Sequence, residues 1–142
     1  MSAPPAPIVI DTNRVLDLLV FQDTEVAELR AALAAGRLRW LVTPAMRAEL
    51  ARVLGYPRIA PRLEAAALPA ETVLAAFDRA SVCVEAPAGA PVRCRDPDDQ
   101  IFIDLAVQQG AHLLSKDARV LGLARRLAPL GVRVTRDWPS SR

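Results

Sequence analysis

Short apolar runs alternate along the chain with longer segments in which apolar residues recur every three or four positions. A short apolar run bounded by polar residues predicts a buried strand. Such runs occur at residues 7–11, 40–42, 112–115 and 132–135. Residues 82–84 alternate with polar neighbours and are a candidate for a further strand.

The segments between these strands have the spacing of amphipathic helices. They comprise residues 12–21, 24–35, 44–54, 59–66, 70–80, 98–109 and 117–127. Pro44 suits the first turn of its helix, and Gly36 suits the position just after a helix end. Strands that alternate with helices predict an α/β fold, in which a parallel sheet is covered on both faces.

At 142 residues, the chain has the length of one domain. We expect a short tail over residues 1–6, a single domain over 7–136 and a second tail over 137–142. No apolar run approaches the roughly 20 residues of a membrane span. The N-terminal segment also lacks the basic and long apolar parts of a signal peptide. Cys83 and Cys94 match no metal or redox spacing, so we expect reduced thiols and a cytoplasmic protein.

Four acidic residues occupy positions that the predicted fold directs to one place. Asp11 ends the first apolar run, and Asp117 follows the strand at 112–115. The carboxyl ends of parallel strands share one edge of the sheet, where α/β folds build their sites. Glu49 and Asp99 belong to two of the predicted helices. Clustered carboxylates without a matching set of bases suit Mg²⁺ or Mn²⁺, which indicates metal-assisted cleavage of a phosphodiester.

Each acid also has a purely structural interpretation. Asp11 could cap the helix that follows it, and Glu49 could form a surface ion pair. Asp96, Asp98 and Asp99 crowd at the start of one helix, where a single carboxylate would be enough to cap it. We expect Asp98 to be that cap. Three neighbouring like charges destabilise a fold unless a cation is bound, so their number favours a metal site.

Four motifs, in this order along the chain, resemble those of the PIN domain family. They are Ile10-Asp11-Thr12-Asn13, Pro44-Ala45-Met46-Arg47-Ala48-Glu49-Leu50, Cys94-Arg95-Asp96-Pro97-Asp98-Asp99-Gln100-Ile101-Phe102 and Leu114-Ser115-Lys116-Asp117. The resemblance extends over residues 7–135 and is closest to VapC-like toxins of toxin–antitoxin systems. It implies a three-layer α/β/α sandwich with a central parallel sheet. Two positions depart from the family pattern: Arg119 stands where an Asp is frequent, and Arg14 where an apolar residue is common.

The resemblance implies an endoribonuclease that depends on Mg²⁺ or Mn²⁺ and cleaves single-stranded or looped RNA. Asp11, Glu49, Asp99 and Asp117 match the family's four acidic positions and are the expected catalytic residues. Asp11 and Asp99 are expected to bind the metal directly, and Asp117 directly or through water. Glu49 is expected either to bind through water or to orient the nucleophile.

Five further residues are assigned to the surroundings of this site. Asn13 and Ser115 match small polar positions of the family, and Asp96 can reach the site only from a loop because Pro97 keeps it out of the helix. Arg14 and Lys116 are candidate RNA contacts, with a solvated surface cation as the alternative. We expect a homodimer without membrane association. A small antitoxin protein is the expected partner, and the apolar helical face near residues 15–35 is its candidate docking surface.

Two other functions fit parts of the pattern. A phosphatase similar to the haloacid dehalogenases also begins with a strand that ends in Asp. That family, however, has a second Asp where this chain has Asn13, and its Lys precedes the late acidic pair, whereas Lys116 follows Asp98 and Asp99. The remaining alternative is an inactive PIN-like module that binds RNA and uses its acids only as helix caps. The presence of all four acids argues against it.

Overall fold

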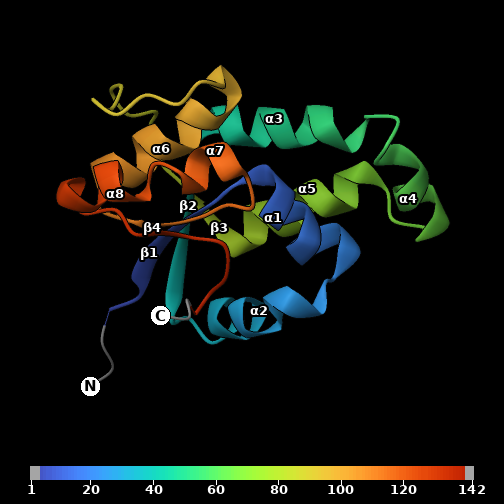
Figure 1. Cartoon of the computed structure of the whole chain (residues 1–142). Coiled ribbons are helices and arrows are strands. Elements are labelled where there is room, and N and C mark those ends of the chain that lie inside the picture. The colour runs from blue at the N-terminus through green and yellow to red at the C-terminus, as the bar shows by residue number, and fades with distance from the viewer. Residues whose placement is uncertain (1–3, 140–142) are drawn as a thin grey trace.

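A five-stranded sheet forms the centre of the computed structural model, which describes residues 4–139 (Figure 1). Its strands are β1 (Ala6–Ile10), β2 (Leu38–Val42), β3 (Ser81–Cys83), β4 (His112–Leu114) and β5 (Val134–Thr135). All neighbouring strands are parallel, and their order is β3-β2-β1-β4-β5. The predicted central parallel sheet is confirmed, and residues 81–83 supply the further strand.

Helical segments connect the strands. They are α1 (Thr12–Leu16), η1 (Asp17–Phe21), η2 (Thr24–Val26), α2 (Ala27–Ala34), α3 (Pro44–Leu54), α4 (Ala60–Ala65), α5 (Ala70–Ala80), α6 (Pro97–Gln109), α7 (Ala118–Leu121), α8 (Ala124–Leu127) and η3 (Ala128–Leu130). Connections between parallel strands are right-handed. The connection that contains α2 and the one that contains α6 run in opposite directions across the sheet, so these two helices cover opposite faces. Figure 1 shows α2 below the strands and α6, α7 and α8 above them. The fold is the expected three-layer α/β/α sandwich.

The central strand β1 is buried on both faces. Ile8, Val9 and Ile10 are each no more than 2% exposed. Burial on both faces explains why the sequence shows a continuous apolar run here, since a strand with one wet face would alternate. At the edge strand β3, in contrast, Val82 is 42% exposed.

Two predicted helices are interrupted. The predicted helix over residues 12–21 consists of α1 followed by the π-helix η1, and Gln22 ends it with a left-handed backbone at φ 48°. The predicted helix over 117–127 is divided into α7 and α8 at Gly122. Glycine is among the weakest helix formers, and the apolar pattern on either side of it conceals this break.

Arg14 of α1 is buried and joins distant segments. Its guanidinium donates to Asp17 at 2.9 Å, to Glu25 at 3.1 Å and to Asp137 at 2.8 Å. Its Nε donates to the carbonyl oxygen of Arg136 at 3.1 Å. This differs from the expectation that Arg14 faces RNA or solvent. A buried guanidinium requires carboxylate partners, and one of the three, Asp137, lies 123 residues away in the sequence.

Replacing Arg14 with Met should destabilise the protein by about 3 kcal/mol or more, because the buried carboxylate of Asp17 loses a partner. Unfolding in urea would measure this change. The matched control is Arg47→Met, which removes an exposed ion pair with Asp78 and should change stability little. Equal effects of the two substitutions would contradict the structural role given to Arg14.

Candidate active site

The direction in which the chain winds reverses at β1. From β1 the chain proceeds to β2 and β3 on one side, and it then crosses to β4 and β5 on the other. Such a switch point leaves a crevice at the carboxyl ends of the two central strands, where α/β proteins bind ligands. Asp11 directly follows β1, and its backbone N–H donates to the carbonyl of Leu114, the last residue of β4, at 2.9 Å. The first and last sequence motifs therefore meet at this crevice.

Asp11 has a buried carboxylate that is held by Ser115. It occupies the cap position of α1, yet its side chain makes no capping hydrogen bond. Instead, the hydroxyl of Ser115 donates to Oδ2 of Asp11 at 2.6 Å and accepts a hydrogen bond from the backbone N–H of Asp117 at 3.0 Å. Burial raises the pKa of the Asp11 carboxyl, against the lowering effect of the Ser115 hydrogen bond. Ser115 thus fixes the positions of two acids.

Glu49 reaches the same region from α3. The hydroxyl of Thr12 donates a hydrogen bond to its Oε2, which connects the first motif to the second. Partial burial is the main cause that raises the pKa of Glu49, and the negative charges of Asp11 and Asp98 add to it. Asn13, the expected supporting residue, is exposed, and Thr12 is the residue of this motif that contacts Glu49. Thr12 is the first residue of α1, and no local pattern in the sequence indicates its contact with Glu49.

Asp99 is the most perturbed carboxyl of the group. It lies in the first turn of α6, and its Oδ2 is buried without a hydrogen-bond partner among the described residues. Burial, followed by the negative charges of Asp11, Asp117 and Asp96, raises the pKa of Asp99 to about 7. A carboxylate oxygen that lacks both water and a donor is costly, and a bound cation would compensate it.

Arg119 lies against the outer side of the acidic group. Its guanidinium contacts Asp117 at 3.1 Å and Asp96 at 3.4 Å. The hydrogen bond from Arg119 is the main cause that lowers the pKa of Asp117. Asp117 also accepts a hydrogen bond from the backbone N–H of Arg119 at 2.8 Å and so caps α7. The residue that departs from the family pattern therefore neutralises part of the acidic charge.

The cap of α6 is Asp96 and not Asp98, which corrects the expectation from the sequence. The side chain of Asp96 accepts a hydrogen bond from the backbone N–H of Asp98 at 2.9 Å. The reason is geometric, since Pro97 forms the first helical position and leaves the residue before it as the cap. Asp98 itself is exposed. Asp96 thus serves as helix cap and as a partner of Arg119.

The remaining basic candidates are engaged in other contacts. The amino group of Lys116 contacts Asp17 at 2.7 Å, and Arg14 is buried as described above. His112 is the only histidine of the chain and lies at the start of β4, away from the carboxyl edge. Burial lowers the pKa of His112 to about 4, so its ring is neutral at neutral pH.

The donor set determines which cofactor the crevice could hold. Within residues 4–139, no three His, Cys, Asp or Glu side chains are grouped closely enough to hold one metal ion. Asp11, Asp99 and Asp117 nevertheless offer only carboxylate oxygens, and the buried Oδ2 of Asp99 lacks a donor. Hard divalent cations such as Mg²⁺ and Mn²⁺ prefer such ligands. These side chains therefore match a hard divalent cation in the type of donor atom and in charge.

The acidic residues Asp11 and Asp117 thus follow the two central strands at the switch point of a parallel sheet, where α/β proteins place their ligand sites. A family model described as PIN domain matches residues 7–119. The chain therefore belongs to the PIN domain family, a family of nucleases that act on nucleic acids and typically use divalent metal ions. Among proteins of curated function, none matches the chain. This membership favours a nuclease over the phosphatase alternative.

None of the helices in the described part of the chain has both the length and the apolar character needed to cross a lipid bilayer.

The raised pKa of Asp99 predicts how stability depends on pH. As the pH rises from about 4 to about 7, the folded protein retains a proton that the unfolded chain loses. The free energy of unfolding of the metal-free protein should therefore fall over this range. Asp99→Asn should weaken the fall and make the protein more stable than the wild type at pH 8. Urea unfolding at several pH values would measure both effects.

The exposed neighbour supplies the control for this experiment. Asp98→Asn removes a charge from the same helical turn but leaves Asp99 in place, so it should preserve most of the wild-type pH dependence. A pH dependence that is unchanged in Asp99→Asn would show that this carboxyl ionises like a solvated one.

Proposed function

We propose that this protein is a Mg²⁺- or Mn²⁺-dependent endoribonuclease that cleaves single-stranded or looped RNA. The main support is the buried, unpartnered Oδ2 of Asp99, whose carboxyl is further destabilised by the charges of Asp11 and Asp117. A fold does not keep such a group for stability, since replacing it would remove the cost. A site that binds a cation accounts for it. Membership of a nuclease family supports the reaction class.

In this proposal Asp11 and Asp99 hold the metal, and Asp117 binds it directly or through water. A bound Mg²⁺ or Mn²⁺ would supply an activated water and would neutralise charge on the reacting phosphate. Ser115 sets the orientation of the Asp11 carboxylate through its hydrogen bond. It also holds the backbone of Asp117, so one hydroxyl positions two of the ligands.

Glu49 has a different role in the proposal. Its pKa is raised, which makes it a better proton acceptor than an exposed carboxylate. The hydrogen bond from Thr12 fixes one of its oxygens and leaves the other able to orient the attacking water. Asp96 acts indirectly, because its ion pair with Arg119 helps to hold the Arg119 guanidinium against the acidic group.

Cleavage of labelled RNA by the purified protein tests this function. Single-stranded RNA should be cut in the presence of Mg²⁺ or Mn²⁺ and left intact with a chelator, and a perfect duplex should be cut less. Asp11→Asn and Asp99→Asn should lower the rate by orders of magnitude, because each removes a ligand. Ser115→Ala should lower it by roughly tenfold to a hundredfold, as expected for a residue that orients a ligand.

Two neighbouring variants serve as controls in the same assay. Asp98→Asn should be nearly neutral because the residue is exposed. Asp96→Asn should lie between Asp98→Asn and Asp99→Asn, since Asn retains the helix cap but weakens the interaction with Arg119. If Asp98→Asn abolishes cleavage and Asp99→Asn retains it, the third ligand is misassigned. If no nucleic acid is cut under any condition, the inactive module is the better description.

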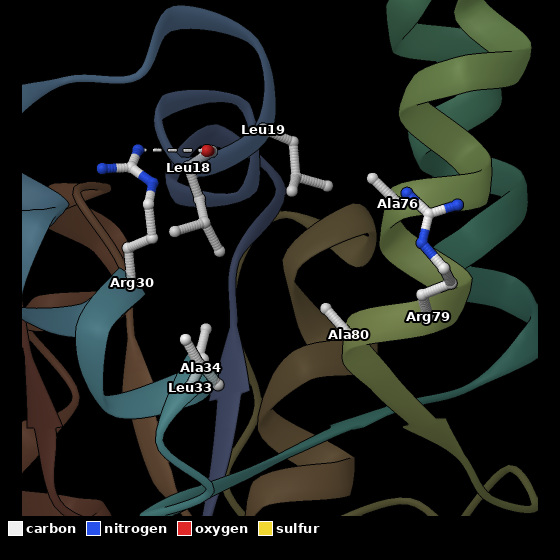
Figure 2. Close-up of a pocket in the computed structure, with 8 residues that line it drawn as sticks. All are labelled: Leu18, Leu19, Arg30, Leu33, Ala34, Ala76, Arg79 and Ala80. Carbon is white, nitrogen blue, oxygen red and sulfur yellow. Dashed lines mark hydrogen bonds between the residues drawn. The ribbon is translucent and has the colours of Figure 1, made fainter.

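We further propose that the nuclease is the toxin of a toxin–antitoxin pair and that it acts in the cytoplasm as a homodimer. Figure 2 shows an apolar hollow that involves the predicted docking face, with Leu18, Leu19 and Leu33 facing Ala76 and Ala80 of α5. Arg30 and Arg79 line the same hollow. This chemistry suits an apolar antitoxin segment flanked by acidic residues. The free thiols of Cys83 and Cys94 are consistent with a reducing compartment.

The toxin role predicts an effect on living cells. Induced expression of the wild-type chain in a bacterial host should arrest growth, whereas Asp99→Asn at equal protein level should not, because arrest requires cleavage. Equal growth in the two cultures, despite cleavage of RNA by the purified wild type, would contradict the toxin role and leave the nuclease in place. Light scattering of the purified protein would test the dimer.

A further inference from the structure

A cleft of about 480 Å³ opens beside the acidic crevice, a size common among ligand pockets. Two of its lining residues belong to the candidate active site motifs. Asn13 directly follows Thr12, which holds Glu49, and Lys116 lies between Ser115 and Asp117. The lining also includes Val53 of α3. The cleft is therefore a lateral continuation of the crevice.

The helix α3 shows the direction of this continuation. Val53 lies four residues after Glu49, and residues at this spacing share one face of a helix. The cleft then extends beyond the end of α3 to Arg58 and to Arg62 of α4. A chain bound at Glu49 would thus pass along α3 towards α4.

The charge of the cleft is opposite to that of the crevice. Its lining contains Arg58, Arg62 and Lys116 and no Asp or Glu. Lys116 is paired with Asp17, but within the described residues Arg58 and Arg62 form no ion pair with a carboxylate. Both arginines are exposed, so their guanidinium groups can bind an anion without losing a carboxylate partner.

The cleft also presents aromatic side chains. Tyr56 is 50% exposed, a high value for a large apolar side chain, and lies in the turn after α3. Phe21 lines the cleft too, and the guanidinium of Arg62 stacks over its ring at 4.0 Å from the centroid. Aromatic rings and guanidinium planes beside unpaired cations are the features with which proteins bind single-stranded nucleic acids.

We propose that this cleft is a subsite for the single strand that flanks the cleaved phosphate. An unpaired base stacks on Tyr56, and the neighbouring phosphates contact Arg58 and Arg62. The inference rests on the proposed nuclease function and adds the place and the residues that would hold the strand beside the cleaved phosphate. A duplex cannot use this subsite because its bases are stacked on each other, so the cleft selects unpaired nucleic acid.

Binding of a short fluorescent single-stranded RNA tests the subsite, with every protein carrying Asp99→Asn to prevent cleavage. Tyr56→Ala should weaken binding roughly tenfold because base stacking is removed, whereas Tyr56→Phe should retain the affinity. The double variant Arg58→Ala/Arg62→Ala should lower the slope of log affinity against log salt by roughly 0.7 for each phosphate that the protein no longer neutralises. Affinity for a duplex of the same length should change little in Tyr56→Ala.

The matched control is Arg37→Ala/Arg39→Ala. These two arginines are also exposed, but they lie at the amino-terminal end of β2, opposite the edge that carries the acids. This variant loses the same charge and should bind RNA almost as the parent does. Weakening in the cleft variants alone supports the subsite.

Two results would overturn the subsite, and they differ in what they say about the nuclease. If the unmodified protein cleaves RNA while the cleft variants bind like the control, the strand follows another path and the nuclease stands. If the unmodified protein neither binds nor cleaves RNA or DNA, the proposed function fails together with the subsite.

Discussion

The pairing of β1 with β4 places the beginning of the chain beside a segment about a hundred residues away. Residues Ile8, Val9 and Ile10 are in register with His112, Leu113 and Leu114. Two hydrogen bonds continue this pairing past the strand ends: the backbone of Asp11 donates to Leu114, and Ser115 donates to the Asp11 carboxylate. The geometry of the acids therefore depends on a long-range contact between two apolar strands. A slip of register would separate Asp11 from Ser115 and expose apolar side chains.

The structure contains two groups of acidic side chains, and they differ in how many of their members are paired with a cation. Around Arg14, the carboxylates of Asp17, Glu25 and Asp137 each have a cationic partner, so burial of charge is compensated. In the crevice, Arg119 forms ion pairs with the outer acids Asp117 and Asp96 but not with Asp11 or Asp99. The pKa values of the Asp11 and Asp99 carboxyls are raised, so the folded state disfavours their charged forms. These two residues therefore lower the stability of the metal-free fold at neutral pH. Local destabilisation of this kind is characteristic of functional sites.

Most of the architecture could be predicted from the sequence because it follows from local patterns. The apolar runs gave the strands, helical spacing gave the helices, and Pro44 and Gly36 marked helix boundaries correctly. The alternation of strands and helices was enough to predict the parallel sheet and to bring Asp11 and Asp117 to one edge. The predicted catalytic and metal-binding roles of the acids stay predictions.

The features that escaped prediction depend on contacts between distant residues. Arginine is normally a surface residue, so an exposed Arg14 was expected. Its burial is possible because the carboxylates of Asp137 and Glu25 pack against its guanidinium. Thr12 became a partner of Glu49 through the approach of α3, which no local pattern reveals. The cap at Asp96 could have been found, since the proline after it defines the first helical position.

The distribution of charge is compatible with both proposed ligands, a polyanion and a cation, although the net charge of the chain is only +2. A uniformly basic surface would attract nucleic acid but would repel divalent metal, and a uniformly acidic one would do the reverse. Here the carboxylates gather at the carboxyl edge of β1 and β4, while Arg58 and Arg62 lie along the adjoining cleft. Opposite charges separated along one path would hold a strand at its flank and present a single phosphate to the acids. Net charge therefore says little about this protein, whereas the placement of charge relative to the sheet edge accounts for both proposed ligands.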